Sequence, residues 1–251
     1  MSLYLSRLIL DLRSRQVMSE IAHPYEMHRT LMRAFPKASD DSKLEAREEL
    51  GVLFRADVEE RRGVVKVYVQ SLIEPDWSFL NRLDGYLYED VDGPNPSCKN
   101  ILSAYQKIQN GQTLAFRLRA NPTKRNAREG DPLKGKRVEL QREEEQIQWL
   151  MDKGQGGRNG VPGGFELLTK KIENGQGEDL LIPRVNVRCE GKQKTYKGGQ
   201  ANGHTMTHLS VLFEGALRVT DAKAFLETLV RGVGSGKAFG FGLLSVAPLR
   251  K

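Results

Sequence analysis

Hydrophobic and polar positions in the first half of the chain follow the order β-α-β-β-α-β. Two short runs, 53–58 and 65–69, alternate on either side of the turn 61–63, which predicts a β-hairpin with one buried face. This order of elements is that of a ferredoxin-like unit. The other elements expected here are a strand over 3–10, a loop over 11–22, a helix that starts at Pro24 and stops at Pro36, a surface turn or short helix over 39–49, a helix over 97–110 and a strand over 113–120.

The second half of the chain repeats this pattern without visible residue identity. We therefore predict an α+β fold of two tandem ferredoxin-like (RRM-like) domains, with a first domain over 1–121, a basic linker over 122–135 and a second domain over 136–251. The elements expected in the second half are a strand over 136–140, a helix over 143–153, a glycine-rich segment over 154–164, strands over 184–189 and 207–219, a helix capped by Thr220 that ends near Gly232, and a strand over 239–248.

The helix that begins at Pro24 carries the first candidate chemistry. Proline suits the first helical position because it has no N–H to leave unpaired. Tyr25 and His28 are three residues apart, so they are neighbours on one face at the edge of the apolar stripe. An imidazole beside a phenol, near Arg29 and Arg33, can transfer protons next to a phosphate. The alternative from spacing alone is an ordinary surface helix. The apolar stripe consists of Met27, Leu31, Ala34 and Phe35.

A glycine-rich run over 232–242 is the second candidate. It differs from a P-loop because Arg231 stands where the first glycine is required and Ala238 replaces the magnesium-binding Ser or Thr. A helix also precedes the glycines, whereas a P-loop requires a preceding strand, so we expect no nucleotide cofactor. One interpretation is that the glycines let the backbone approach a phosphate chain, with Lys237 adding charge. The other is a turn whose glycines permit tight packing.

The charge of the chain favours a polyanionic partner. Its 251 residues carry a net charge of +7 and give a pI near 9.4, which favours a nucleic acid over a membrane surface as the partner. Basic residues on a predicted strand and on the segment after it form a stripe suited to phosphate contacts, and a basic segment over 192–197 could engage an RNA stem. Each of these residues is alternatively a solvated surface charge. The candidates for RNA binding are Arg117, Arg119, Lys124, Arg125, Lys192 and Lys194.

Several other classes of protein are disfavoured by the sequence. Cys98 and Cys189 are too few for a disulfide framework or a zinc site and are expected to be reduced thiols. His204 and His208 have no nearby cysteine, and no metal constellation is visible, so we expect neither a metal nor another cofactor. Because the chain contains no run of about 18 apolar residues and no signal-peptide pattern, we expect a cytoplasmic protein without a membrane partner.

Three motifs in order along the chain carry a resemblance to a known family. They are Tyr25-Glu26-Met27-His28-Arg29 after a strand, then the segment 117–123, then the glycine-rich run 232–242. Together they resemble the CasE endoribonucleases of type I-E CRISPR systems. The resemblance runs from the first strand to the last and is weakest over 141–203.

This resemblance implies a function and roles for individual residues. A CasE-type protein would cleave CRISPR precursor RNA at the base of the repeat stem-loop by attack of a 2′-hydroxyl, without a metal, and leave a 2′,3′-cyclic phosphate. His28 would act as general acid or base and Tyr25 would position or polarise the reacting groups, while Arg29 and Lys237 would hold the phosphate. The protein would stay on its product as a subunit of Cascade, beside other Cascade proteins. The alternative is an RNA-hairpin-binding subunit without catalysis.

Overall fold

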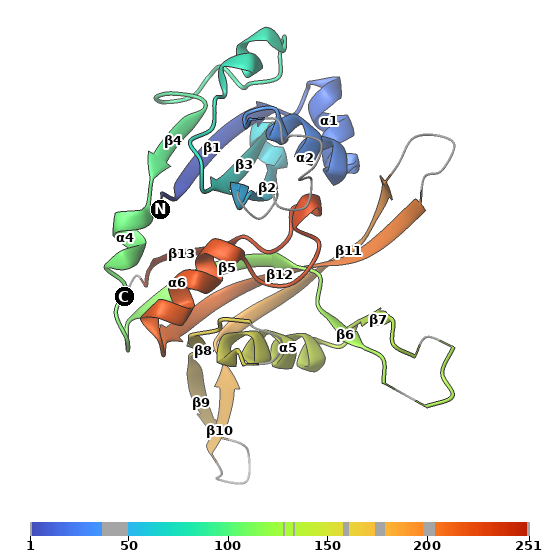
Figure 1. Ribbon diagram of the computed structural model, residues 1–251, viewed down its shortest axis with the longest axis vertical. Coiled ribbons are helices and arrows are strands. Elements are labelled where there is room, and N and C mark those ends of the chain that lie inside the picture. The colour runs from blue at the N-terminus through green and yellow to red at the C-terminus, as the bar shows by residue number, and fades with distance from the viewer. Residues whose placement is uncertain are drawn as a thin grey trace. The chain divides into compact units, whose positions relative to one another are not determined.

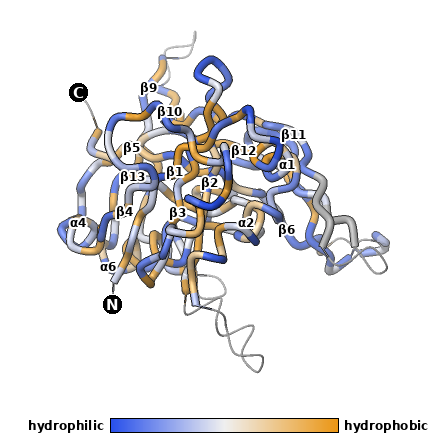
Figure 2. Tube along the Cα trace, turned by 90° about the horizontal axis from the view of Figure 1, so that it is seen from above, coloured by the Kyte–Doolittle hydropathy of each residue, from blue (hydrophilic) through white to orange (hydrophobic). Residues whose placement is uncertain are grey.

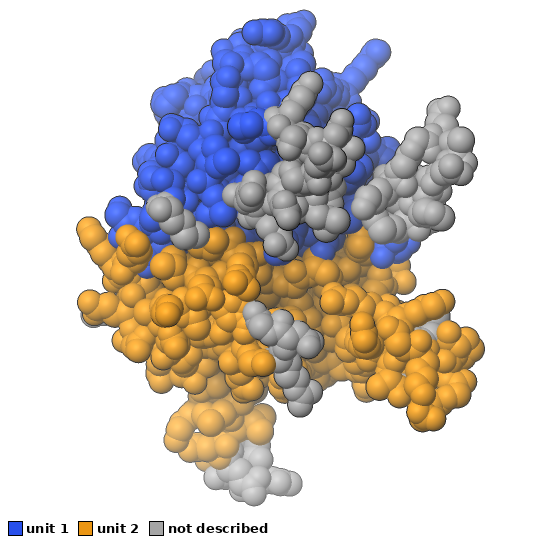
Figure 3. All heavy atoms as spheres, in the orientation of Figure 1, with its two compact units in different colours: residues 1–105, 194–207, 236–243 blue, residues 106–193, 208–235, 244–251 orange. Residues whose placement is uncertain are grey.

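The computed structural model describes residues 2–36, 50–127, 129–132, 134–157, 161–173, 179–197 and 204–249; for 194–197 and 204–206 only the backbone is described (Figure 1). The chain divides into two compact units (Figure 3). Unit 1 comprises Met1–Tyr105, Lys194–Thr207 and Gly236–Leu243, and unit 2 comprises Gln106–Gln193, His208–Ser235 and Leu244–Lys251. The segment expected to form a turn or helix over 39–49 lies outside the described residues.

Unit 1 contains a four-stranded antiparallel sheet in the order β2-β3-β1-β4. Because β3 lies between β1 and β2, the sheet has the split β-α-β arrangement of a ferredoxin-like domain. Gly63 ends the 3₁₀ turn of the β2–β3 hairpin in the left-handed conformation, at φ 65°, as the predicted turn requires. The elements are β1 (Tyr4–Asp11), α1 (Arg15–Ala22), α2 (Pro24–Met32), β2 (Leu53–Glu59), η2 (Glu60–Arg62), β3 (Val64–Ser71), η3 (Ser78–Arg82), β4 (Ser97–Asn100) and α4 (Leu102–Gln106).

The sheet of unit 2 repeats this strand order. It runs β11-β12-β5-β13, and β8 pairs with the end of β12. The side chain of Asp221, rather than the expected Thr220, caps α6 by accepting from two backbone N–H groups. The elements are β5 (Thr113–Ala120), β6 (Thr123–Arg125), β7 (Arg137–Glu139), α5 (Glu143–Gln155), β8 (Phe165–Leu167), β9 (Thr169–Glu173), β10 (Asp179–Pro183), β11 (Val185–Lys197), β12 (His204–Val219), α6 (Ala222–Arg231), η5 (Lys237–Phe239) and β13 (Leu244–Pro248).

The prediction of two ferredoxin-like domains is confirmed, but the strand over 113–120 belongs to the other sheet. β5 pairs with β12 and β13, so it opens the second sheet instead of closing the first. Among the described residues, the short strand expected over 136–140 (β7) pairs with β6 in a separate two-stranded ribbon, and β6 lies in the expected linker. Alternation predicts that a strand has one buried face, but it does not specify the neighbour with which that strand pairs.

Four local predictions are also wrong. The segment 11–22, expected to be a loop, contains α1, whose single buried apolar residue Val17 gives little helical signal. The helix expected over 97–110 is instead β4 followed by the five-residue helix α4, because pairing with β1 decides the conformation of 97–100. In the second half, β11 extends to Lys197 through a segment expected to be a loop, and β13 begins five residues later than expected, at Leu244.

The apolar stripe of α2 packs as its spacing predicts. Met27 and Leu31 are buried in the core that β1, β2 and β3 form with the helices, together with Ala34 and Phe35 just beyond the helix. Figure 2 colours the chain by hydropathy and shows hydrophobic and hydrophilic stretches alternating along it. The opposite face of α2 stays at the surface. Within the described ranges, every helix is too short or too polar to cross a lipid bilayer.

The register of β5 against β12 can be tested by cross-linking. Arg117 and Glu214 are directly opposite each other, so cysteines at both positions, with the native cysteines replaced by serine, should form a disulfide on oxidation. A matched pair at Arg117 and Arg218, four residues out of register and about 13 Å apart, should stay reduced. Thiol titration and peptide mapping after oxidation show whether each of the two cysteine pairs has formed a disulfide. Cross-linking of the second pair alone would contradict this register.

Candidate active site

Helix α2 brings Tyr25 and His28 together at its surface. Pro24 occupies the start of the helix and Glu26 lies in its first turn, where its charge complements the helix dipole. The rings of Tyr25 and His28 are 6.0 Å apart between centroids, inclined at 37°, and both residues are half-buried. The adjacency expected from their spacing is therefore present.

Two phenylalanines extend this pair into a row of four rings, the aromatic row. Phe239 of η5 lies 5.8 Å from the Tyr25 ring, and Phe54 of β2 stacks against His28 at 6.1 Å and 16°. Phe54 is only 1% exposed, so the imidazole has a fixed apolar wall on one side. Neither phenylalanine was identified from the sequence as part of the site, because their contacts join α2 to segments far away in the chain.

The glycine-rich run reaches the aromatic row through η5. Gly236 and Gly240 flank η5 with φ of 82° and 81°, a region that other residues rarely adopt. A Cβ atom on Gly240 would lie 3.2 Å from Cε2 of Phe54, so the backbone approaches the ring closely there. These glycines therefore permit tight packing, one of the two roles expected for them. Lys237 is exposed at the start of η5.

Arg29, on α2, and Arg33, at the C-terminal end of that helix, have different partners. Arg29 forms an ion pair with Glu26 at 2.8 Å, but the two side chains are 66% and 47% exposed. Such a pair contributes at most about 1 kcal/mol, so Arg29 can exchange Glu26 for a phosphate at little cost. The guanidinium of Arg33 lies 4.4 Å from the centroid of the Phe79 ring.

Arg117 and Arg119, both in unit 2, are engaged by carboxylates. Arg117 pairs with Glu214 at 2.6 Å at the surface. Arg119 donates two hydrogen bonds to Glu190, of 2.6 and 2.9 Å, and its side chain is only 13% exposed. Burial raises the pKa of Glu190, but the hydrogen bonds and charge of Arg119, helped by Ser210, outweigh burial and lower this pKa below 4.5. A phosphate at Arg119 would have to compete with Glu190.

The other basic candidates also belong to unit 2, apart from Lys194. Lys124 pairs with Glu145 at 2.9 Å and Lys192 pairs with Glu139 at 3.0 Å. Arg125 is exposed and stands directly opposite Arg137, a residue that the sequence interpretation did not select. Two like charges in this position repel each other, so an anion bound between them would stabilise this hairpin. The backbone of Lys194 lies on β11, and its side chain lies outside the described residues.

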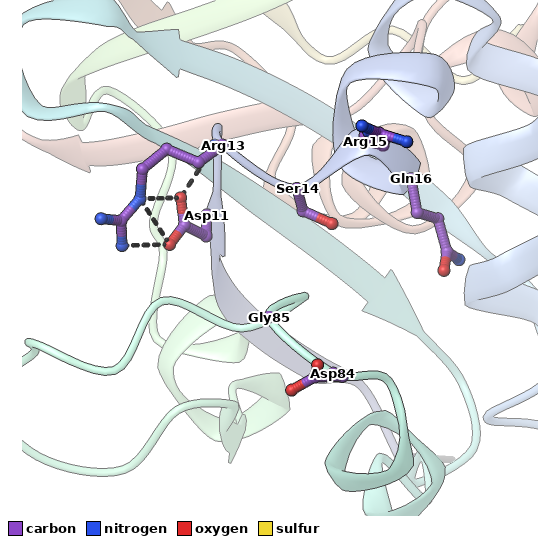
Figure 4. A pocket seen from close by; sticks show the side chains of 7 residues that line it. All are labelled: Asp11, Arg13, Ser14, Arg15, Gln16, Asp84 and Gly85. Atoms are coloured by element: carbon purple, nitrogen blue, oxygen red, sulfur yellow. Dashed lines mark hydrogen bonds and ion pairs between the residues drawn. The ribbon is translucent and has the colours of Figure 1, made fainter.

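A separate polar hollow lies at the start of α1 and contains none of the candidates (Figure 4). It has a volume of about 420 Å³, and its principal cation, Arg13, points to Asp11, with Nη2 and Oδ2 2.6 Å apart. Hydrogen bonds from Arg13 lower the pKa of Asp11, so the two charges satisfy each other. The hollow is lined by Asp11, Arg13, Ser14, Arg15, Gln16, Asp84 and Gly85.

No metal-binding cluster of three or more His, Cys, Asp or Glu side chains occurs among the described residues. His208 is one of the two histidines for which no role is expected from the sequence, and its Nδ1 lies 3.0 Å from the Asn121 side-chain nitrogen. Because that nitrogen donates, Nδ1 accepts. Burial lowers the pKa of His208, which keeps the imidazole neutral at neutral pH.

Fold and site together define an α+β protein of two tandem ferredoxin-like domains with a half-buried tyrosine–histidine pair. The family described as CRISPR associated protein matches residues 3–248, and the chain belongs to this family.

Individual relatives agree with this assignment. The chain is 41% identical over 248 residues to CRISPR-associated endoribonuclease Cse3 of Thermus thermophilus, covering 98% of this chain and 100% of the relative. It is 32% identical over 149 residues to CRISPR system Cascade subunit CasE of Escherichia coli, covering 57% and 62%. The structure of Thermus thermophilus Cse3 bound to an RNA representing a pre-cleavage complex matches 99% of this chain and 100% of that chain, with a TM-score of 0.67 and 36% identity.

The Arg119–Glu190 pair should contribute to stability in a pH-dependent way. Arg119→Met should lower the free energy of unfolding by about 2 to 3 kcal/mol at pH 7, because it leaves a sheltered carboxylate without its main partner. Arg117→Met, at the exposed pair, should cost less than about 1 kcal/mol.

Lowering the pH should narrow the difference in the free energy of unfolding between wild type and Arg119→Met. The pKa of Glu190 is lower in the folded protein than its ordinary value of 4.5, so the ionised carboxylate stabilises the fold at pH values above 4.5. This stability is lost as the pH falls through the lowered pKa. Urea unfolding from pH 7 to pH 3 measures the difference. A difference that stays constant over this range would show that Glu190 is not the source.

The close approach of Gly240 to Phe54 gives a further prediction. Gly240→Ala should destabilise the protein by about 2 kcal/mol through backbone strain and crowding of the ring. Gly63→Ala is the matched control, because its φ is also positive but its Cβ would meet nothing within 4 Å, so it should lose only about 1 kcal/mol. Equal losses in urea unfolding would argue against tight packing of Gly240 on Phe54.

Proposed function

We propose that this protein is an endoribonuclease that cleaves CRISPR precursor RNA at the base of the repeat stem-loop. The observation that carries the proposal is the Tyr25–His28 pair, whose rings lie 6.0 Å apart at the surface of α2. The relative with 41% identity bears the name CRISPR-associated endoribonuclease, and its structure was determined with an RNA representing a pre-cleavage complex.

In this proposal the attacking group is the 2′-hydroxyl next to the scissile phosphate. A base removes its proton, the 2′-oxygen bonds to phosphorus, and the bond from phosphorus to the 5′-oxygen breaks while an acid protonates that oxygen. The products are a 2′,3′-cyclic phosphate and a 5′-hydroxyl. His28 takes one of the two proton-transfer roles and Tyr25 positions or polarises the reacting groups. Each proton transfer typically contributes a factor of about 10² to 10⁴ to the rate.

Cations near α2 stabilise the charge that develops on the phosphate, and no metal ion takes part in the proposed reaction. Arg29 is the first candidate, because the ion pair that holds it is exposed and weak. Lys237 is exposed on η5, next to Phe239 of the aromatic row, and is the second candidate. Arg33 lies on the turn after Arg29 and provides further positive potential for the RNA backbone.

RNA binding outside the cleavage site uses the basic residues of unit 2. The opposed pair Arg125 and Arg137 suits an anion best, whereas Arg117, Arg119, Lys124 and Lys192 already have carboxylate partners. Contacts of this kind fix the register of an RNA without reading its sequence. The protein then stays on the cleaved hairpin as a subunit of Cascade in the cytoplasm; the Escherichia coli relative bears the name Cascade subunit.

Cleavage of a labelled repeat RNA hairpin in excess EDTA tests the proposal. Wild type should cut once, and His28→Ala should cut at least about 10²-fold more slowly while its Kd for the RNA stays within about threefold. His23→Ala is the matched control, because His23 is exposed just before α2 and its Nδ1 lies 3.1 Å from the carbonyl oxygen of Ser19, on α1.

The remaining outcomes separate the alternatives. A 2′-deoxy substitution at the cleaved position should abolish cutting, and end-group analysis should find a cyclic phosphate. Cleavage that survives in His28→Ala would refute the role of this residue, and loss of cleavage in EDTA would refute the metal-independent route. Tight binding without any cleavage by wild type would favour the non-catalytic hairpin-binding subunit.

A further inference from the structure

A buried carboxylate lies directly beneath the helix that carries Tyr25 and His28. Glu20, on α1, is only 4% exposed. Its Oε1 accepts hydrogen bonds from the Thr30 hydroxyl at 2.6 Å and the Gln16 amide at 2.9 Å, and its Oε2 accepts from the Tyr86 hydroxyl at 2.6 Å. This set of groups, the Glu20 clamp, joins α1, α2 and the segment after η3 within unit 1.

The donors of the clamp are three neutral groups. Hydroxyl donors to an ionised carboxylate make short, strong hydrogen bonds, and both distances of 2.6 Å lie in that range. Burial, with the charge of Glu20 second, raises the pKa of Tyr86 far above its ordinary value, so this phenol remains a donor at every working pH. Glu20, Thr30 and Tyr86 are all buried, and a buried hydrogen-bonded network of this kind holds its members in one arrangement.

Helix α2 needs such a restraint because it is short. It spans nine residues, Pro24–Met32, and an isolated helix of that length is marginal in water, so tertiary contacts set its position. The His23 cap between α1 and α2 makes no side-chain capping hydrogen bond. Apolar contacts of Met27 and Leu31 hold α2 on the sheet, but such contacts are non-directional. The hydroxyl of Thr30 provides a directional link to Glu20, and it lies two residues after His28.

We propose that Glu20 is a positioning residue for the reaction: through Thr30 it fixes α2 so that Tyr25 and His28 face the scissile phosphate. The proposal rests on the proposed function, because it assigns a role within that same site. Glu20 itself does not touch the RNA. A displacement of the catalytic pair by about 1 Å suffices to lower a rate about 10²-fold, so loss of one directional bond is measurable.

Two variants of Thr30 isolate the hydrogen bond. Thr30→Val keeps the shape of the side chain and deletes the hydroxyl, whereas Thr30→Ser keeps the hydroxyl. Under single-turnover conditions with saturating RNA, Thr30→Val should cleave about 10- to 100-fold more slowly than wild type. Thr30→Ser should stay within about threefold, and the Kd for RNA should change less than about threefold in both. Tyr86→Phe should slow cleavage in the same way, because it removes the other anchor of Glu20.

A destabilised control separates positioning from a merely structural role. Val17→Ala removes buried apolar volume from the same helix as Glu20 and keeps every hydrogen-bonding group of the clamp. Its thermal unfolding midpoint should fall at least as far as that of Thr30→Val. At temperatures below that midpoint, however, its cleavage rate should match that of wild type. A wild-type rate in Thr30→Val, or equal slowing in Val17→Ala, would overturn the proposal.

Failure of the underlying function gives a different result. If wild type does not cut the RNA at all, the endoribonuclease proposal fails, and the clamp is then judged by the His28 imidazole signals in NMR spectra. Those signals should shift in Thr30→Val and stay at their wild-type positions in Thr30→Ser and Val17→Ala. Unshifted signals in Thr30→Val would show that the clamp does not position His28.

Discussion

The packing of α2 on the first sheet is the constraint on which the candidate active site depends. Its inner face is buried through Met27 and Leu31, and this burial turns the neighbouring face, with Tyr25 and His28, to the surface. Phe54 rises from the same sheet to stack on His28. Hydrophobic burial thus supplies most of the free energy that holds α2 on the sheet, while the stacked Phe54 ring and the hydrogen bond to Glu20 restrict the orientation of the helix and its His28 side chain.

The glycine-rich run has a structural role that follows from this packing. It returns to unit 1 after the chain has formed most of unit 2, and it places Phe239 against Tyr25. A backbone with side chains at Gly236 and Gly240 could not adopt the positive φ of this turn at low cost. The catalytic pair of the proposed enzyme is therefore completed by residues from both ends of the chain. Short motifs distant in sequence are thus in contact in unit 1.

Much of the fold was predictable from local patterns. The hairpin of β2 and β3, the start of α2 at Pro24, and the helices α5 and α6 follow from alternation, helical spacing and capping. The adjacency of Tyr25 and His28 follows from the geometry of any helix. Errors arose where long-range pairing overrides local preference, as in 97–100, and where polar positions conceal a helix, as in 11–22.

The sequence by itself determined most of the element types, the excess of positive charge and the presence of a phenol and an imidazole one helical turn apart, because these are properties of composition and spacing. Only the tertiary structure decided which sheet contains β5, which rings surround His28, and that Arg119 has a carboxylate partner 71 residues away in the chain. Each of these depends on residues distant in the chain coming within a few ångströms of one another, and alternation or charge along one segment carries no record of the partner.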